Sequence, residues 1–381
     1  MTLDELRVEI DAADDEIAPL LARRMGLAAQ VAAAKRENGM PVSQPAREKA
    51  VLARLGAGLE PQYVPALETV YSAIFRASRE YQQGLLRVNE DSSLRRKIAE
   101  GAARGQAGFP ESAAVACQGI AGAYAHQAAL RIFKEPDVMF LRTFDTVFRA
   151  VERGQCRYGV LPIENSSYGS VATVFDLLHR YRCKIVRAAR LPITHCLLSR
   201  AGSLDDVREI CTHEQALGQC GGFLETLGDR VTVTVCENTA VAARTVAESG
   251  RDDLAAISSE ECASLYGLGV LQRGVQNEAH NETRFICIAR QAEIYPGANK
   301  SSVLLTLQHR PGSLAEMLQL VAARGVNLTK LESRPIPGSN FDFMFYLDME
   351  CDASQPGTAD FLEALERHSE EFSFLGSYTE E

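Results

Sequence analysis

The chain has 381 residues, of which 46% are hydrophobic and 24% charged, and its formal net charge is −10. These values are typical of a globular protein with two to four domains, and an acidic chain is a poor partner for nucleic acid or an anionic membrane. If the ligand is an anion, basic side chains must be gathered locally.

Ten cysteines are spread from Cys117 to Cys351 without a CxxC pair or zinc-like His/Cys spacing. They predict free thiols in a reducing cytosol, no disulfide framework and no metal site. The charged N-terminus lacks the pattern of a signal peptide, and no apolar run approaches the ~18 residues of a membrane span. A cytoplasmic protein without cofactors is therefore expected.

Residues 1–88 are predicted to be all helical. Apolar side chains recur at helical spacing from Leu3 to Val31, and Asn38, Gly39 and Pro41 mark the end of the first helix. This helix would be roughly 50 Å long. It cannot be buried alone, so a homodimer or higher homo-oligomer is expected. Pro19 lies inside it and predicts a local kink. Further helices are predicted over 45–55 and 63–86.

Basic side chains share a face of the first predicted helix. Arg24 and Lys35 are 11 residues apart and return to nearly the same face. Arg7 lies roughly 26 Å before Arg24 along the helix. It could therefore reach the same ligand only from an antiparallel partner helix. Taken singly, such charges could be solvated, but Arg47, Glu48, Ser78 and Gln82 could complete a polar pocket with them.

This arrangement resembles the all-helical chorismate mutase domain, an intertwined dimer, over residues 1–86. The resemblance implies a site formed by Arg7 of the partner, Arg24, Lys35, Arg47, Glu48, Ser78 and Gln82. Rearrangement of chorismate to prephenate needs a dianion held in a compact conformation and positive charge at the breaking ether bond. Lys35 and Gln82 would flank the ether oxygen, and Glu48 would bind the ring hydroxyl. Gln44 stands where the family often has an acidic residue, so weakened activity is expected.

Residues 89–112 are polar and rich in Gly and Ala, which predicts a linker with one short helix. Over residues 113–294, short apolar runs alternate with amphipathic helices. This pattern is typical of an α/β fold with mainly parallel strands, and two lobes around a cleft are expected.

Four polar turns accompany the predicted strands, at residues 117–126, 161–167, 211–219 and 282–285. The first contains two glycines before a helix, whose N–H groups could bind an anion, although a tight turn without a ligand is equally consistent. Three histidines could transfer protons. His126 and His195 are interpreted as core or surface residues, and the role of His213, at a helix start, is left open.

Together, the glycine turn, the segment Pro162–Ser167 and the motif Thr283-Arg284-Phe285 resemble the prephenate dehydratase domain. The resemblance implies a fold like a two-lobed periplasmic binding protein and loss of CO2 and water from prephenate to give phenylpyruvate. It implies that Thr283 helps the hydroxyl leave, that Arg284 anchors a carboxylate and that Asn165 is also catalytic. The substrate-binding residues implied are Gly122, Ala123, Tyr124, Glu164, Ser166, Thr212, Gln215, Gln219 and Phe285.

Residues 300–381 predict strand, helix, two strands, helix, strand, which is the ferredoxin-like α+β arrangement. Strands are expected over 302–309, 326–334, 341–350 and 372–379, with helices over 313–324 and 358–369. The turn Gly312-Ser313-Leu314 and the segment Glu332-Ser333-Arg334 resemble the ACT domain of the same family. The resemblance implies a pocket for L-phenylalanine at a domain interface and feedback inhibition.

The predicted protein is thus a bifunctional chorismate mutase–prephenate dehydratase with an ACT domain. Two alternatives stay open. One is a prephenate or arogenate dehydratase whose mutase domain is weak or inactive. The other is a non-enzymatic amino-acid sensor, which would have no need for Thr283, Arg284 or the basic residues of the helical domain.

Overall fold

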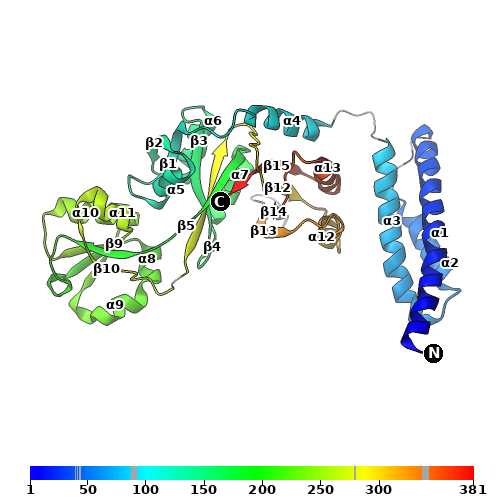
Figure 1. Cartoon of the computed structure of the whole chain (residues 1–381), viewed down its shortest axis with the longest axis horizontal. Helices are drawn as coiled ribbons and strands as arrows, with labels where there is room; N and C mark the ends of the chain where they lie inside the picture. Colours follow the sequence, from blue (N-terminus) through cyan, green and yellow to red (C-terminus); the bar gives the residue numbers. More distant parts are fainter. Residues whose placement is uncertain (39, 41, 43, 87–91, 279, 337–342) are drawn as a thin grey trace. The chain divides into compact units, whose positions relative to one another are not determined.

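The computed structural model describes residues 1–38, 40, 42, 44–86, 92–278, 280–336 and 343–381. The chain forms two compact units, Met1–Ser92 and Ser93–Glu381 (Figure 1). The predicted Gly39 and Pro41 and the start of the predicted strand 341–350 lie outside the described residues. In the described residues no helix is both long and apolar enough to cross a bilayer, and no group of His, Cys, Asp and Glu is arranged to hold a metal ion.

The first unit is helical, as predicted. It contains α1 (Leu3–Glu37), α2 (Pro45–Gly56), the short 3-10 helix η1 (Pro61–Tyr63) and α3 (Val64–Leu86). Thr2 and Glu5 cap the start of α1 reciprocally, since Thr2 Oγ1 accepts from the Glu5 N–H and the Glu5 carboxylate accepts from the Thr2 N–H. Pro19 lies within α1, which continues through it.

One long apolar face of α1 is uncovered. Within the first unit only Ala28 and Ala32 of this helix are buried. Large apolar side chains along the rest of the helix remain exposed: Leu3, Leu6, Ile10, Ile17, Leu20 and Leu21. Exposed apolar surface of this extent is typical of a face that binds another protein surface.

The second unit contains two α/β lobes joined by two chain crossings. The first lobe contains β1 (Ser112–Gln118), α5 (Tyr124–Ile132), β2 (Glu135–Leu141), α6 (Phe144–Glu152), β3 (Tyr158–Asn165), β4 (Gly169–Ser170), α7 (Ala172–Tyr181), β5 (Lys184–Pro192) and β11 (Glu282–Ala289). The second lobe contains β6 (Cys196–Ser199), η2 (Leu204–Asp206), β7 (Glu209–Thr212), α8 (Glu214–Gln219), α9 (Gly221–Leu227), η3 (Gly228–Arg230), β8 (Thr232–Val235), α10 (Thr239–Ser249), β9 (Leu254–Ser258), α11 (Glu260–Tyr266) and β10 (Gly269–Arg273).

The prediction of mainly parallel strands was only partly correct. β1, β2 and β3 are parallel, and so are β7, β8 and β9. The strands next to the crossings run antiparallel to their neighbours: β11 against β3 and β5, and β6 against β9 and β10. The chain leaves the first lobe along β5 and returns along β11, which forces these two strands to run in opposite directions.

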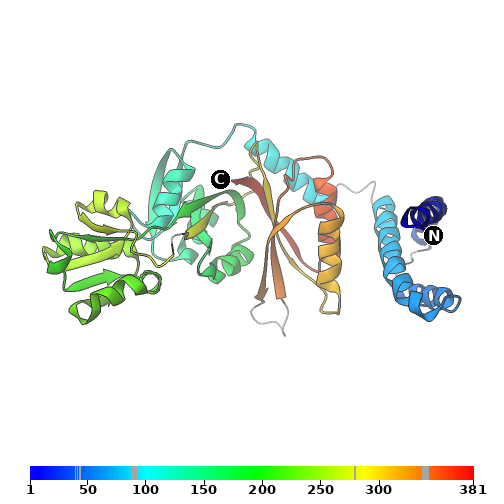
Figure 2. The same cartoon turned by 60° about the horizontal axis from the view of Figure 1, so that its bottom comes forward.

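The C-terminal region has the predicted βαββαβ order. It comprises β12 (Lys300–Thr306), α12 (Ser313–Ala323), β13 (Leu328–Pro335), β14 (Phe343–Met349), α13 (Thr358–His368) and β15 (Phe372–Glu380). Its strand order is β13-β14-β12-β15, and β15 also pairs with β5, so one sheet continues from this domain into the first lobe. The helices α12 and α13 cover one face of the strands and the first lobe covers the other (Figure 2).

The region predicted as a linker contributes a packed helix. α4 (Ser93–Gly105) buries Leu94 and Ile98 in the core beneath α13. A side chain at Gly105 would place its Cβ 1.9 Å from the carbonyl oxygen of Ile294, so this contact requires glycine. Residues 93–105 therefore belong to the second unit.

Candidate functional site

The helical unit contains a cavity of about 440 Å³ between its three long helices. Six of the seven residues predicted for this unit line it: Arg24, Lys35, Arg47, Glu48, Ser78 and Gln82. Arg54 and Arg79 also line it, so five basic side chains face one carboxylate in a chain with a net charge of −10. Such an excess of positive charge suits a multivalent anion.

Contacts between helices hold several of these groups in place. Arg24 Nη1 donates to Ser78 Oγ (3.2 Å), and its guanidinium lies 5.5 Å from the ring centre of Phe75. Lys35 Nζ donates to the carbonyl of Val42 (2.7 Å). Gln82 is buried, and its Oε1 has no hydrogen-bond partner among the described residues. A buried polar atom of this kind calls for a partner, which a ligand could supply.

Glu48 has a partner that the sequence did not predict, whereas the position of Arg7 agrees with the expectation that it could reach this site only from a second copy of the chain. Glu48, predicted to bind a ring hydroxyl, is ion-paired to Arg79, which the sequence analysis overlooked although it directly follows Ser78. Arg7 does not line the cavity; it is exposed and pairs with Asp4 (3.2 Å) near the start of α1. The chain by itself therefore supplies the cavity without Arg7.

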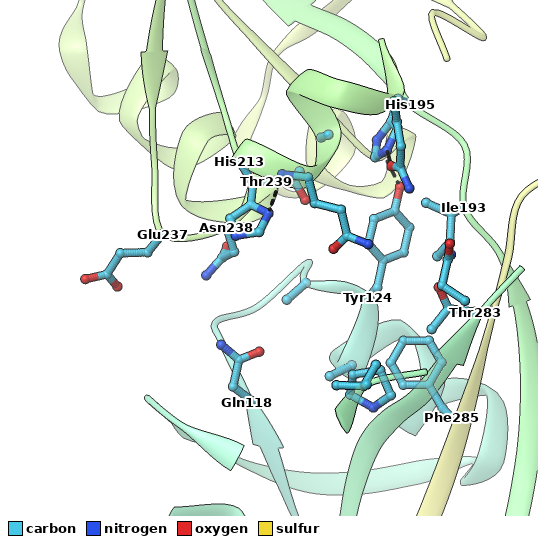
Figure 3. A pocket seen from close by; sticks show the side chains of 18 of the residues that line it. Gln118, Tyr124, Ile193, His195, His213, Glu237, Asn238, Thr239, Thr283 and Phe285 are labelled. Atoms are coloured by element: carbon cyan, nitrogen blue, oxygen red, sulfur yellow. Dashed lines mark hydrogen bonds between the residues drawn. The ribbon is translucent and has the colours of Figure 1, made fainter. Parts of the chain in front are cut away.

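The second cavity, of about 450 Å³, lies between the two α/β lobes (Figure 3). Seven of the twelve predicted catalytic and substrate-binding residues of this domain line it: Ala123, Tyr124, Asn165, Gln215, Gln219, Thr283 and Phe285. No lysine or arginine is among its described lining residues. Bound carboxylates would meet the N-terminal N–H groups of α5 and α10 and neutral side-chain donors instead.

Asn165 and Thr283 form the polar centre of this cavity. They lie opposite each other on β3 and β11, and Asn165 Nδ2 donates to Thr283 Oγ1 (2.9 Å). The Asn165 amide is itself oriented, because its Oδ1 accepts from the N–H groups of Ser167 (3.0 Å) and Tyr168 (2.9 Å). Among the described residues no acceptor takes the Thr283 hydroxyl hydrogen, which leaves it available to a ligand.

Three predicted substrate-binding residues support the cavity from outside its lining. Thr212 is buried and donates to the carbonyl of Ile257 (3.2 Å). Ser166 Oγ accepts from the Glu282 N–H (2.9 Å). Gly122 has φ +86°, and a Cβ there would lie 2.8 Å from Cys262 Sγ, so it shapes the turn before Ala123 and Tyr124. These three residues stabilise the walls of the cavity without lining it, and their contact with substrate stays a prediction.

Arg284 and Glu164 point away from the cavity, contrary to the sequence expectation. They are partners across β11 and β3, one position along from Thr283 and Asn165, and successive strand residues face opposite sides. Arg284 Nη1 lies 3.2 Å from Glu164 Oε1 and also contacts Asp348 of β14. The predicted role of Arg284 as a carboxylate anchor in this cavity does not agree with its position.

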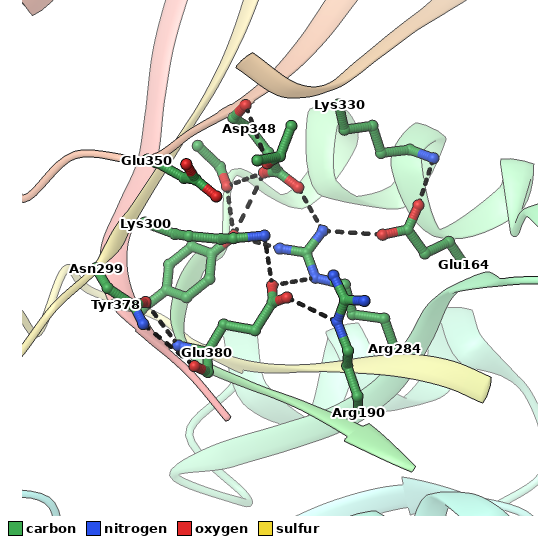
Figure 4. Close-up of polar contacts among 12 residues, drawn as sticks. Glu164, Arg190, Arg284, Asn299, Lys300, Lys330, Asp348, Glu350, Tyr378 and Glu380 are labelled. Carbon is green, nitrogen blue, oxygen red and sulfur yellow. Dashed lines mark hydrogen bonds and ion pairs between the residues drawn. The ribbon is translucent and has the colours of Figure 1, made fainter. Parts of the chain in front are cut away.

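Arg284 is instead the centre of a buried ion cluster between the first lobe and the C-terminal domain (Figure 4). Its Nε lies 2.6 Å from Glu380, and its Nη2 donates to the Tyr378 hydroxyl (2.9 Å). Three more cations join the cluster by ion pairs with its carboxylates: Arg190, Lys300 and Lys330. Despite burial, neighbouring charges raise the pKa of Arg284 and lower that of Glu380.

The histidines near the cavity are held neutral. His195 is buried beside the cavity and its Nε2 donates to Gln219 Oε1 (2.7 Å). His213 caps α8, its Nδ1 accepting from the Gln215 N–H (3.3 Å). Burial lowers the pKa of His195, His213 and His126. At neutral pH these rings can accept or relay protons but add little positive charge.

We expect His195 to make stability depend on pH. Its folded-state pKa lies below the unfolded value of about 6.5, so protonation favours the unfolded chain as pH falls through that value. The urea midpoint of the wild type should therefore fall more steeply between pH 8 and 5.5 than that of His195→Asn. Parallel curves for the two proteins would contradict this assignment.

Several lining residues were missed by the sequence analysis. Asn238 caps α10 by accepting from the Val241 N–H (2.8 Å), and Asn238, Thr239 and Glu237 line the cavity. The signal was present, because Asn238 follows the apolar strand β8 and precedes an apolar helix, as an N-cap does. Gln118 and Phe144 complete the wall from the first lobe.

The predicted sensor residues occupy two faces of the C-terminal domain. Ser313 and Leu314 line a cavity of about 440 Å³ with Arg310, Phe343 and Phe345. Ser333 pairs in register with Phe345 on that side of the sheet. Glu332 and Arg334 face the first lobe instead: Glu332 accepts from Ser170 (2.6 Å), and Arg334 makes two hydrogen bonds to Asp176 (3.0 and 3.2 Å).

Comparison with known proteins matches three families in order along the chain. Residues 6–83 match chorismate mutase type II, residues 115–293 prephenate dehydratase, and residues 301–368 the ACT domain. A bifunctional chorismate mutase/prephenate dehydratase of Aquifex aeolicus is 31% identical over 382 residues, covering 99% of this chain and 97% of that protein. Arogenate dehydratase/prephenate dehydratase 2 of Arabidopsis thaliana is 38% identical over 277 residues, covering 69% of this chain and 72% of that protein.

The crystal structure of a prephenate dehydratase from Arthrobacter aurescens in complex with L-Phe resembles the second unit. It is 29% identical, with a TM-score of 0.63, and the match covers 70% of this chain and 90% of that chain. An anion-suited helical cavity, a two-lobed polar cleft and an ACT domain define a multidomain enzyme with a regulatory module. The chain belongs to the bifunctional chorismate mutase/prephenate dehydratase family, and the family and fold class predicted from the sequence are confirmed.

Proposed function

We propose that the chain catalyses two consecutive reactions of L-phenylalanine biosynthesis. Chorismate is rearranged to prephenate in the helical cavity, and prephenate loses CO2 and water between the two lobes to give phenylpyruvate. The observation that supports this proposal is that one chain contains both a cavity lined by five basic side chains, in the first unit, and the hydrogen-bonded Asn165 and Thr283, in the second. The first suits a dianion, and the second offers a hydroxyl hydrogen to the departing group of the ring compound.

In the helical cavity, catalysis would consist of holding the substrate in the reactive conformation and stabilising the charge that develops in the transition state. Chorismate is a dianion, and its rearrangement needs no nucleophile and no proton transfer. Arg24 and Arg47 would bind its carboxylates, while Lys35 and Gln82 would meet the ether oxygen as negative charge develops there. The unpartnered Gln82 Oε1 requires the amide to turn or a hydroxyl to donate to it.

A second copy of the chain would complete the helical site. The exposed apolar face of α1 supports a homodimer in which this helix packs against its counterpart. An antiparallel arrangement would bring Arg7 of the second copy toward the cavity that contains Arg24. The free and mostly buried cysteines support a reducing compartment such as the cytoplasm.

In the two-lobed cavity Thr283 would assist departure of the ring hydroxyl. Aromatisation drives the reaction: the carbon–carboxyl bond breaks to release CO2, its electrons enter the ring, and the carbon–oxygen bond breaks so that the hydroxyl departs as hydroxide, which takes a proton from solvent to become water. Asn165 occupies an acceptor site of the Thr283 oxygen, which directs the threonine hydrogen toward the substrate. The hydrogen bond would strengthen as negative charge develops on the leaving oxygen.

Arogenate is a second candidate substrate for the dehydratase site. It differs from prephenate by an ammonium group in place of the keto group, and the Arabidopsis relative is an arogenate dehydratase/prephenate dehydratase. Glu237 is the one acidic side chain among the described lining residues and could pair with that ammonium. Comparison of kcat/KM for the two compounds decides between them.

L-Phenylalanine is proposed to inhibit the enzyme by binding the ACT domain near Ser313 and Leu314. β13 connects that pocket with the dehydratase domain, because Ser333 lies on the pocket side and Lys330, Glu332 and Arg334 contact the first lobe. A shift of β13 would therefore reach Glu164, the neighbour of Asn165, through Lys330. Inhibition requires only that the effector bind one position of this strand more tightly than another.

We expect Arg334→Gln to raise the L-phenylalanine concentration for half-inhibition about tenfold, while the uninhibited kcat stays unchanged. The reason is loss of its paired hydrogen bonds to Asp176 (3.0 and 3.2 Å). Asp176→Asn should weaken inhibition similarly, although Asp176 lies in the dehydratase domain. The exposed Arg324→Gln is the control. Normal inhibition in Asp176→Asn would contradict this route.

The test of the proposed function is turnover of chorismate by the purified full chain. Phenylpyruvate should appear after a lag in which prephenate accumulates, and L-phenylalanine should suppress it. Formation of neither compound would refute the proposal. Formation of prephenate without phenylpyruvate would support the mutase activity and refute the dehydratase activity.

A further inference from the structure

A further cavity lies where α4, α7 and β5 meet the ACT domain, away from the dehydratase cavity and from the sensor turn. Its volume is about 590 Å³. Basic side chains enter it from separate parts of the chain: Lys97 and Arg104 from α4, Arg182 after α7, Lys184 at the start of β5, and Arg290 after β11. No role in either reaction has been assigned to these residues.

The positive charge in this cavity is not balanced. Its other charged lining residues are Glu100, Glu366 and Glu371, so five basic side chains face three carboxylates, and His179 is the remaining titratable residue. Arg104 pairs with Glu100 (3.1 Å). In the described part of the chain, no carboxylate lies within ion-pair distance of the other four basic groups. This imbalance is notable in a chain of net charge −10.

Lys184 shows that the cations crowd one another. Its side chain is largely buried, and its Nζ uses one hydrogen to donate to the carbonyl of Phe374 (2.6 Å). Burial, Lys97 and Arg182 together lower the pKa of Lys184 to about 8. The ammonium keeps two further donors, and a bound anion would offset the repulsion among these groups.

Arg182 is held at the cavity in an unusual backbone conformation. It follows α7 with φ +53°, and it is the one non-glycine residue with positive φ in the described chain. Glycine is usual at such a helix end, since other residues adopt this conformation at a cost. The dipole of α7 favours a cation at its C-terminus. It does not account for Lys97 and Arg290, which come from other elements.

We propose that this cavity binds a small multivalent oxyanion, carrying phosphate or several carboxylates, between Lys97, Arg182, Lys184 and Arg290. Charge-assisted hydrogen bonds from guanidinium and ammonium groups are the usual means of recognising such anions. The ligand would contact α4 through Lys97, the start of β5 and the residue Arg182 before it, and the segment after β11 through Arg290, and so would join three parts of the second unit. The size of the cavity admits an anion of citrate dimensions or inorganic phosphate.

The experiment is calorimetric titration of the full chain with inorganic phosphate and, separately, citrate, at constant ionic strength set with chloride. The chain carries Arg24→Gln and Lys35→Gln, so that the helical cavity does not compete. We expect saturable binding of at least one of the two anions, at one site per chain. Phosphate binding alone identifies a phosphate site, and citrate binding alone a carboxylate site.

The exposed pair Lys97→Gln and Arg290→Gln should weaken that binding at least tenfold without unfolding the protein. The matched control is Arg131→Gln with Arg153→Gln, two exposed arginines that do not line the cavity and have the same total charge change. If both double variants lost the same anion affinity, the loss would reflect overall charge alone, and the proposed site would be refuted. Absence of saturable binding by either anion would overturn it as well.

Discussion

Thr283→Val is expected to lower kcat of the dehydratase reaction by about 10²–10³-fold, since one hydrogen-bond donor to developing negative charge is typically worth that factor. Valine has nearly the shape of threonine, and the loss therefore reports on the hydroxyl. The mutase reaction of the same protein should be unchanged. The measurement is kcat for prephenate and for chorismate in separate assays of one preparation.

Thr283→Ser is the matched control, because it keeps the hydroxyl on the same backbone opposite Asn165. It should retain most of the dehydratase activity. If Thr283→Val stayed within a few-fold of the wild type while folding normally, Thr283 could not be the donor to the leaving hydroxyl, and a neutral histidine or a bound water would have to take that role.

Arg284→Met is expected to destabilise the second unit by about 3–5 kcal/mol, the usual effect of removing one partner from a buried ion cluster. The substitution leaves Asp348, which is fully buried, and Glu380 without their principal cation. Thermal unfolding of the second unit should shift to lower temperature, and the pH of acid unfolding should rise. The pKa of Glu380 is lowered in the folded state, so its stabilising contribution is lost as pH falls through that pKa.

Arg251→Met provides the comparison for Arg284. Arg251 pairs with Glu209 and Asp253 (2.8 Å each), but Arg251 and Asp253 are exposed and Glu209 is only half-buried, and such surface pairs contribute little. Arg251→Met should therefore change the unfolding temperature far less than Arg284→Met does. Adding Asp348→Asn to Arg284→Met should restore part of the lost stability, because it removes the uncompensated charge. An additive, further loss in the double variant would contradict the cluster's role.

Periodicity and turn residues predicted most of the architecture. Helical spacing placed α1, α2 and α3 within one or two residues, and the βαββαβ order of the C-terminal domain follows from its alternating runs. The helical site was equally accessible, because Arg24 and Lys35 share a face by helix geometry alone. Their convergence with Ser78 and Gln82 came from the family resemblance.

The error over Arg284 has a simple physical cause. The motif Thr283-Arg284-Phe285 was treated as one site, although adjacent residues of a strand face opposite sides. The same alternation separates Glu164 from Asn165 on β3 and Glu332 from Ser333 on β13. The sequence alone could not show which element packs against the face of β11 that Arg284 occupies. That element is the C-terminal domain, whose strand β15 pairs with β5. The pairing joins segments nearly 200 residues apart along the chain, as between Thr379 and Arg187.

The packing of α4 could not be predicted from its amino-acid composition either. Its polar, Gly-rich sequence is typical of a linker, and only Leu94 and Ile98 are large apolar side chains that it buries. Gly101 and Gly105 permit close backbone contact with Ala292 and Ile294. A glycine required for close approach cannot be distinguished from a glycine in a flexible connector without the structure.

The most direct test follows carbon from chorismate in two single-site variants of the full chain. Thr283→Val should convert chorismate to prephenate and stop. Lys35→Gln should leave chorismate largely unchanged, yet turn supplied prephenate into phenylpyruvate. A mixture of the two proteins should restore phenylpyruvate from chorismate. Loss of both reactions in either variant, or phenylpyruvate from chorismate in both, would contradict two separate sites on one chain.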